Sequence, residues 1–144
     1  MSADPRAVGH TRDAGWEIGV SATLDADADE VWELLTGRGL PLWWGTPTDG
    51  LPTTTGSTGS TAEGGWFEIR SVRPGEKVRL RWSPTGDPTT ATTVQVSVRA
   101  AAGDRSRVGF HEERLPDGAA RERRREHWRQ VLDALVAALG DTRR

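Results

Sequence analysis

The sequence predicts an α+β domain in which a curved antiparallel sheet wraps around one long C-terminal helix. Residues 119–139 carry apolar side chains at helical spacing, which predicts a helix with one buried stripe. Most of the preceding chain alternates apolar and polar residues with the period of two that is typical of half-buried strands. A single helix must bury its stripe against something broad, so we expect the sheet to be its partner and the space between them to be a candidate ligand cavity. The stripe consists of Trp128, Val131, Leu132, Leu135 and Leu139.

The N-terminal part predicts a tail followed by a strand. Residues 1–13 are polar, charged and aperiodic, which predicts a disordered tail and a single domain over residues 14–140. Residues 16–22 alternate in character and predict the first strand. The tail has no apolar signal-peptide core, and the chain has no apolar run long enough to span a membrane. We therefore expect a soluble, cytoplasmic protein.

Two short helices are predicted next. Asp27, followed three residues later by Glu30, is a variant of the capping box and marks the start of the first helix. Gly37 ends that helix, and residues 40–45 predict a second helical turn that carries two adjacent tryptophans. Residues 46–63 are rich in Thr, Gly, Ser and Pro, which predicts a flap with at most one weak strand.

The rest of the sheet is read from alternation and turn residues. Strands are predicted over residues 66–72, 77–82, 92–99 and 108–113. A hairpin turn at Arg73–Glu76 joins the first two of them, and a turn at Leu115–Gly118 leads into the long helix. The element order is a strand, two short helices, several antiparallel strands and one long helix.

Composition excludes several classes of site. Cysteine is absent, which excludes disulfides, thiolate metal sites and thiol catalysis. The net charge of −2 argues against a nucleic-acid-binding protein. Seven tryptophans stand beside two phenylalanines and no tyrosine, and indoles supply large flat apolar surfaces. Most scattered tryptophans belong to core packing, but with seven in so small a domain we expect some to face a ligand.

Five segments carry a resemblance to a known family. They are DEVWELLT at 29–36, LWWG at 42–45, VRPGEKVRLRW at 72–82, FHEERLP at 110–116 and HWRQVLDAL at 127–135. In this order they resemble the START/Bet-v-like superfamily (SRPBCC) with its helix-grip fold. Within it they are most similar to the AHSA-like branch, named after the activator of the 90-kDa heat-shock protein ATPase. The resemblance covers about residues 15–140 and implies the fold rather than one function. The family normally has a well-formed strand where this chain has residues 46–63.

A narrower similarity concerns natural-product clusters of actinobacteria. The chain resembles Arg- and Trp-rich members of the group that protect their producers from enediyne antibiotics by self-sacrifice. Such proteins bind the drug and let its diradical abstract hydrogen from their own backbone. The 17 glycines would supply unshielded backbone hydrogens, although the sequence does not identify one of them. A high-GC genome would also produce this composition.

The residues that might carry chemistry form no recognisable active site. His111 and Glu113 share the face of the last strand opposite Phe110, so we expect a solvated strand end there rather than a metal or acid/base pair. Glu68 is expected on the outer face of its strand, unless a bulge at Gly64–Gly65 reverses the phase and buries it. The three histidines are dispersed, and no nucleophile elbow or phosphate loop is visible, so no metal, cofactor or catalytic residue is predicted.

One charged cluster lies on the long helix. Residues 121–126 contain four arginines and two glutamates. We expect a solvated face in which the glutamates pair with arginines three or four positions away. The alternative is an anionic group that docks at one end of the cavity.

These observations favour a binding protein over an enzyme. We expect it to sequester a hydrophobic, polycyclic small molecule between sheet and helix, with residues 46–63 as a flap, as a monomer or weak dimer without nucleic-acid or membrane partners. Alternatives are a polyketide cyclase-like enzyme with an inward-pointing acid or His127, and a co-chaperone-like protein-interaction module. The predicted wall residues are Trp43, Trp44, Trp66, Trp82, Phe110, Trp128 and Leu132.

Overall fold

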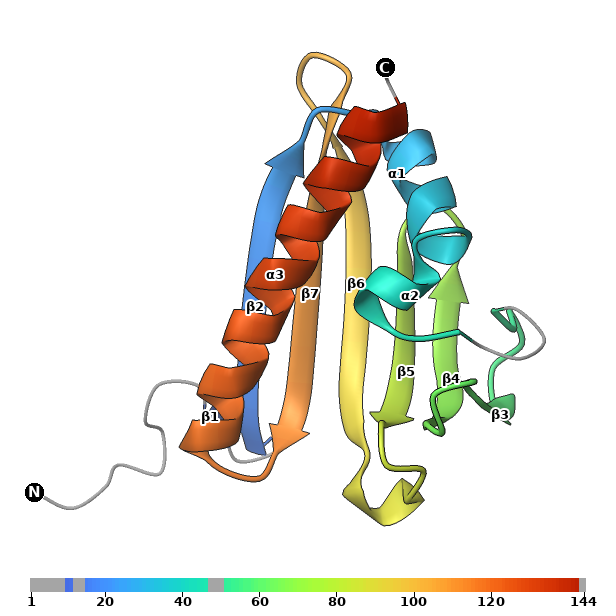
Figure 1. Cartoon of the computed structure of the whole chain (residues 1–144), viewed down its shortest axis with the longest axis vertical. Coiled ribbons are helices and arrows are strands. Elements are labelled where there is room, and N and C mark those ends of the chain that lie inside the picture. Colours follow the sequence, from blue (N-terminus) through green and yellow to red (C-terminus); the bar gives the residue numbers. More distant parts are fainter. Residues whose placement is uncertain (1–9, 12–14, 47–50, 143–144) are drawn as a thin grey trace, which may run out of the picture.

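The computed structural model describes residues 10–11, 15–46 and 51–142, and it has the predicted architecture (Figure 1). A seven-stranded antiparallel sheet has the strand order β1-β2-β7-β6-β5-β4-β3. Its strands are β1 (His10–Thr11), β2 (Gly15–Leu24), β3 (Thr58–Ser60), β4 (Trp66–Arg73), β5 (Lys77–Ser83), β6 (Thr92–Ala101) and β7 (Arg105–Leu115). The helices are α1 (Ala28–Thr36), α2 (Leu40–Trp43) and α3 (Gly118–Thr142), with a 3₁₀ turn, η1 (Pro88–Thr90), between β5 and β6.

Helix α3 lies across one face of the sheet and contacts β2 and β7, as Figure 1 shows. The predicted stripe is buried, and the fold class expected from the sequence is confirmed. Asp117 begins the helix: its Oδ1 accepts a hydrogen bond from the Ala120 N–H at 2.7 Å. The helix continues through Gly140 to Thr142, beyond the predicted end at residue 139.

The sheet therefore has an inner face toward α3 and an outer face away from it. Along β7 the side chains of Ser106, Val108, Phe110 and Glu112 are buried, and those between them are not. The period of two is the cause, because successive strand residues point to opposite faces. The same alternation buries Val78, Leu80 and Trp82 on β5.

Helices α1 and α2 cover the part of the inner face that α3 leaves open (Figure 1). Asp27 caps α1 as predicted, with its Oδ1 2.8 Å from the Glu30 N–H. The indole Nε1 of Trp43 donates to the carbonyl of Leu35 at 2.7 Å. That buried hydrogen bond fixes α2 against α1, although α2 has only one turn.

The segment predicted as a flap is largely irregular. Residues 47–50 lie outside the described residues, and β3, with three residues, pairs only with β4. Glu63 connects the end of this segment to Thr46: its Oε1 accepts from the Thr46 N–H at 2.8 Å, and this bond lowers the pKa of the Glu63 carboxyl. A Cβ at Gly59 would lie 2.6 Å from the Phe67 ring, so only glycine allows β3 to approach the sheet so closely.

Two further predictions concern the chain's borders. Strand β1 falls within residues 1–13, which the sequence predicts as a disordered tail, and pairs with the start of β2. The other residues of that segment lie outside the described part, so the domain boundary stays a prediction. Among the described residues, no helix is long and apolar enough to cross a membrane.

Candidate ligand-binding site

A continuous series of aromatic rings fills the space between the sheet and the helices. On the side of β4 and β5, Trp44 contacts Phe67 edge to face, with ring centroids 4.7 Å apart. The Trp44 ring also meets Trp82 on β5, at 6.2 Å. Trp43 lies 5.8 Å from Trp44 and continues the series toward the middle of the sheet.

The series then reaches α3. The Trp43 ring is 6.1 Å from Phe110 on β7. Phe110 and Trp128 stack face to face, with centroids 4.7 Å apart and planes only 12° from parallel. Trp128 is 1% exposed and Phe110 1%, so this stack is the centre of the core. Leu132, one turn further along α3, is buried as well.

The structure brings six of the seven predicted wall residues to the inner face, and Trp66 is the exception. Trp66 pairs with Ser83 and precedes Phe67, which pairs with Trp82. The buried Phe67 points inward, so Trp66 points outward, where the Arg81 guanidinium lies 5.4 Å from its ring centroid. The prediction that Trp66 lies in an interior wall is therefore wrong. Ligand contact by the other six stays a prediction.

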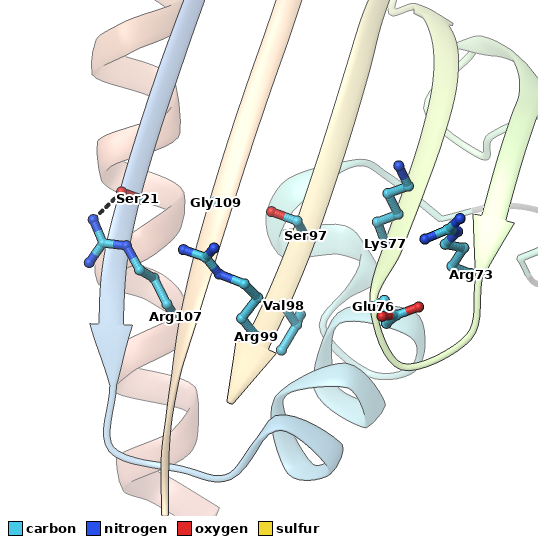
Figure 2. Close-up of a pocket in the computed structure, with 9 residues that line it drawn as sticks. All are labelled: Ser21, Arg73, Glu76, Lys77, Ser97, Val98, Arg99, Arg107 and Gly109. Atoms are coloured by element: carbon cyan, nitrogen blue, oxygen red, sulfur yellow. Dashed lines mark hydrogen bonds between the residues drawn. The ribbon is translucent and has the colours of Figure 1, made fainter. Parts of the chain in front are cut away.

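The interior rings pack on one another. Four well-formed hollows in the described surface are lined by other residues than Trp43, Trp44, Trp82 and Trp128. The largest of these hollows, about 480 Å³, lies on the outer face of the sheet (Figure 2). A ligand between sheet and α3 must therefore displace side chains or α2.

Two buried nitrogen atoms in this interior have no hydrogen-bond partner in the described structure: Nε1 of Trp44 and Nε2 of His127. Leaving a buried N–H unsatisfied costs about 1–3 kcal/mol, so few are found in native proteins. Trp44 is 9% exposed and sits at the middle of the aromatic series. Its N–H thus lies among the aromatic rings without an acceptor in the described structure.

Burial lowers the pKa of His127 to about 4 from its ordinary value of 6.5. The Arg124 guanidinium lowers it too, and the Glu112 carboxylate acts in the opposite direction. The imidazole is consequently neutral at pH 7. It meets the Trp128 ring edge to face at 4.8 Å.

Glu112 is the buried acid that the sequence interpretation missed. It is 2% exposed on the inner face, two residues from Phe110. Its Oε1 accepts from Arg124 Nε at 2.6 Å and from Trp128 Nε1 at 2.9 Å, and its Oε2 accepts from Thr92 Oγ1 at 2.6 Å. These three hydrogen bonds connect β7 to β6 and to α3, so the Glu112 carboxylate anchors the helix to the sheet.

The cluster on α3 is consequently only partly a solvated face. Arg125 lies 4.0 Å from Glu122, three positions away, as the spacing predicts, whereas the pair of Arg121 with Glu122 at 2.8 Å joins adjacent residues. Arg124 instead turns inward to Glu112 and stacks over the Trp128 ring at 5.1 Å. Arg124 and Trp128 are four residues apart and therefore lie on the same face of the helix. This spacing is the signal in the sequence that both could donate to one acceptor, here Glu112.

The acids and histidine expected on the outer face are there. Glu68 lies beside Arg81, at 3.5 Å, so the bulge that would have buried it does not form. Glu17, His111 and Glu113 bring one potential ligand atom each to within 4.8 Å of one another. The Arg79 guanidinium, however, pairs with Glu113 and occupies one side of this group.

Comparison with known proteins places the chain in a family. The model of the family described as "Activator of Hsp90 ATPase homolog 1-like protein" matches residues 25–140, so the chain belongs to this family. No protein with a curated description matches it in sequence.

Solved structures of low sequence identity have the same fold. CalU16 from Micromonospora echinospora is 20% identical, with a TM-score of 0.67. The match covers 86% of this chain and 77% of CalU16. An HSP90 activator from Plasmodium falciparum is 16% identical, with coverages of 88% and 97% and a TM-score of 0.71. DynU16, a protein in the dynemicin biosynthetic locus, is 21% identical with a TM-score of 0.69. The alignment covers 86% of this chain but only 47% of DynU16, so this chain spans about half of that protein.

Proposed function

We propose that this protein binds and sequesters a hydrophobic polycyclic small molecule between the sheet and α3. The aromatic series from Trp82 through Trp44, Trp43 and Phe110 to Trp128 carries this proposal. Flat rings in successive contact offer stacking surfaces to a fused-ring ligand, which aliphatic cores do not. Such a ligand that buries about 300 Å² of apolar surface would gain roughly 7 kcal/mol before ordering costs.

Entry would require the short helix α2 to move. The helix has four residues, and its Leu42 is 36% exposed, so few contacts hold it besides those of Trp43 and Leu40. Movement of α2 would separate Trp43 and Trp44 from the stack at Phe110 and open a slot between them. The neighbouring segment 46–63 would serve as the flap.

The unpartnered indole of Trp44 supports a ligand with a hydrogen-bond acceptor. A carbonyl or hydroxyl oxygen on the polycycle would satisfy Nε1 of Trp44 and recover part of its desolvation cost. His127 Nε2 could receive or donate a second bond at the α3 end, since its imidazole is neutral. Polycyclic quinones and related natural products have both features.

Self-resistance to an enediyne is the particular form that we propose. Support comes from the sequence resemblance to self-sacrifice proteins and from the shared fold with DynU16 of the dynemicin locus. In that form the ligand's aryl diradical abstracts a hydrogen atom from a glycine Cα, and dioxygen adds to the resulting carbon radical and leads to chain cleavage. Two glycines that pack directly against aromatic rings are Gly59, next to Phe67, and Gly65, next to Trp82.

Tryptophan fluorescence titration tests the proposal, with a panel of polycyclic natural products that includes an enediyne and with intact mass measured afterward. We expect saturable quenching. The affinity obtained from it should be at least about tenfold weaker in Trp44→Phe, which loses the free N–H, and unchanged in Trp66→Phe on the other face. Quenching with unchanged mass supports sequestration, and cleavage at one glycine supports self-sacrifice. No response to any compound would refute ligand binding in the interior.

Two other functions have a specific observation in their favour. A cyclase-like enzyme would use His127 as its inward-facing base, since the neutral imidazole has a free ring nitrogen. A co-chaperone role is suggested by the family description and the Plasmodium relative. Turnover of a polyketide substrate that is lost in His127→Gln would favour the first. Stimulation of a 90-kDa chaperone ATPase would favour the second.

A further inference from the structure

We infer that the hollow on the outer face of the sheet is a binding site for a small polyanion that carries phosphate groups. This site is separate from the proposed interior site, because the sheet lies between them. Its floor is a row of small residues across three neighbouring strands: Ser21 on β2 pairs with Gly109 on β7, which pairs with Ser97 on β6. Because the side chains along this row are small or, at Gly109, absent, the surface is hollowed there by about 480 Å³.

Cationic side chains stand around this floor (Figure 2). Lys77 on β5 pairs with Ser97 and extends the row, and Arg73 pairs with Lys77 at the next strand. Arg99 and Arg107 face each other across β6 and β7 on the adjacent row. All four line the hollow.

These cations lack acidic partners. In the described part of the chain no carboxylate lies within ion-pair distance of Arg73, Lys77 or Arg99. Arg107 donates only to neutral hydroxyls, to Ser21 Oγ at 2.7 Å and Thr23 Oγ1 at 3.4 Å. Glu76 is the single acid in the lining, so the site has four positive charges and one negative.

The other half of the outer face is different. There Arg79 pairs with Glu113, and Arg81 and Arg70 share Glu68 at 3.5 Å. On this half, two acids thus pair with three of the four lining arginines, whereas no acid among the described residues pairs with the four cations that line the first hollow. Unpaired convergent cations repel one another, and a bound polyanion would remove that repulsion.

The shape and chemistry of the hollow favour a small phosphate compound over a macromolecule. A volume near 480 Å³ suits a small molecule. Guanidinium groups form paired hydrogen bonds with phosphate, and three are available. No aromatic side chain lines the floor to stack nucleobases, which argues against single-stranded nucleic acid. An extended acidic peptide would run past the hollow onto the other half of the face, where it would meet the carboxylates of Glu68 and Glu113.

Titration with inorganic tripolyphosphate, followed by amide NMR shifts in about 150 mM salt, tests this site. We expect saturable shifts centred on Ser97, Gly109 and Ser21. The double variant Arg99→Gln/Arg107→Gln should weaken binding by at least about tenfold. Glu76→Gln should tighten it about two- to fivefold, because it removes the only negative charge. Ser97→Gln, which fills the floor without a change of charge, should also weaken binding.

The matched control is Arg70→Gln/Arg81→Gln, which removes the same charge from the other half of the face, where both arginines pair with Glu68. Binding should change by less than about twofold in this variant. An equal loss in both double variants, or no saturable binding, would overturn the site and leave general electrostatic attraction. Tighter binding of a deca-glutamate peptide or of a single-stranded oligonucleotide than of tripolyphosphate would overturn the assignment to a small phosphate anion.

Discussion

The two faces of one sheet treat neighbouring residues in opposite ways. On β7, Glu112 is buried and accepts hydrogen bonds from three donors on β6 and α3, whereas Glu113, the next residue, lies on the outer face beside Arg79. On β4, Phe67 packs into the core and Trp66 lies under a surface arginine. Whether a residue is buried or lies on the outer face is therefore decided by its position in the alternation of the strand, and much less by its type.

The difference is also energetic. Burying an ion pair is expensive, and removal of one partner leaves the other uncompensated, at a cost of about 3–5 kcal/mol. Exposed pairs contribute about 0–1 kcal/mol because water screens them. The inner face should thus control stability, and the outer face should control binding of charged ligands.

The largest expected effect is at the buried acid. Glu112→Ala should lower the free energy of unfolding by about 3–5 kcal/mol, because it leaves the Arg124 guanidinium and the Trp128 N–H without an acceptor. Glu113→Ala, its neighbour on the outer face, should cost less than about 1 kcal/mol. Urea denaturation of both variants measures the contrast, and equal losses would show that the two faces do not differ as described.

The next effect compares two tryptophans. Trp128→Phe keeps a ring over Phe110 but removes the donor to Glu112, so we expect a loss of about 2–3 kcal/mol in the free energy of unfolding. Trp66→Phe changes only a surface contact with Arg81 and should cost about 0.5–1 kcal/mol. Thermal denaturation of the pair checks this, and a larger loss in the Trp66 variant would contradict the assignment of faces.

A pH effect on stability is expected at His127 on α3. The pKa of His127 in the folded state is lowered to about 4 from 6.5, so between these values the unfolded chain binds a proton that the folded protein excludes. Stability should therefore fall as the pH falls from about 6.5 to 4. His127→Gln should flatten this dependence when unfolding is measured across this pH range. An unchanged slope in the His127 variant would show that its ring is not shielded from water.

The smallest effect is expected among the unpaired cations. Arg73→Gln or Arg99→Gln should change the free energy of unfolding by no more than about 0.5 kcal/mol, and in the stabilising direction at low salt, since each removes repulsion. Glu76→Gln should have the opposite sign. Denaturation at two ionic strengths measures both, and clear destabilisation by the arginine variants would indicate a structural role for those side chains.

Most of the fold could be predicted because its signals are local. The stripe of α3 and the alternation of β5 and β6 are visible in consecutive residues, and Asp27 with Glu30 marks the start of α1. The same rule was sufficient to place two site residues where the interpretation failed. Trp66 is two residues from Glu68 and must share its outer face, and Glu112 is two residues from Phe110 and must share its inner face.

Other features depend on contacts that no local pattern contains. That Ser21, Gly109 and Ser97 form one row follows from the register of three strands up to 88 positions apart, which sequence spacing alone does not fix. The stacking of Phe110 on Trp128 depends on where α3 crosses β7. The missing partner of the Trp44 indole is likewise a property of the packed interior.

The most direct test of the interior site is a proton–nitrogen correlation NMR spectrum of the indole N–H groups. Each signal is assigned with a single Trp→Phe variant. On addition of a polycyclic ligand that quenches fluorescence, we predict that the Trp44 signal moves downfield as its free N–H gains an acceptor. The Trp43, Trp82 and Trp128 signals should shift with it, and the Trp66 signal on the outer face should stay in place. Shifts confined to Trp66, or equal for inner and outer indoles, would contradict a ligand site between the sheet and α3.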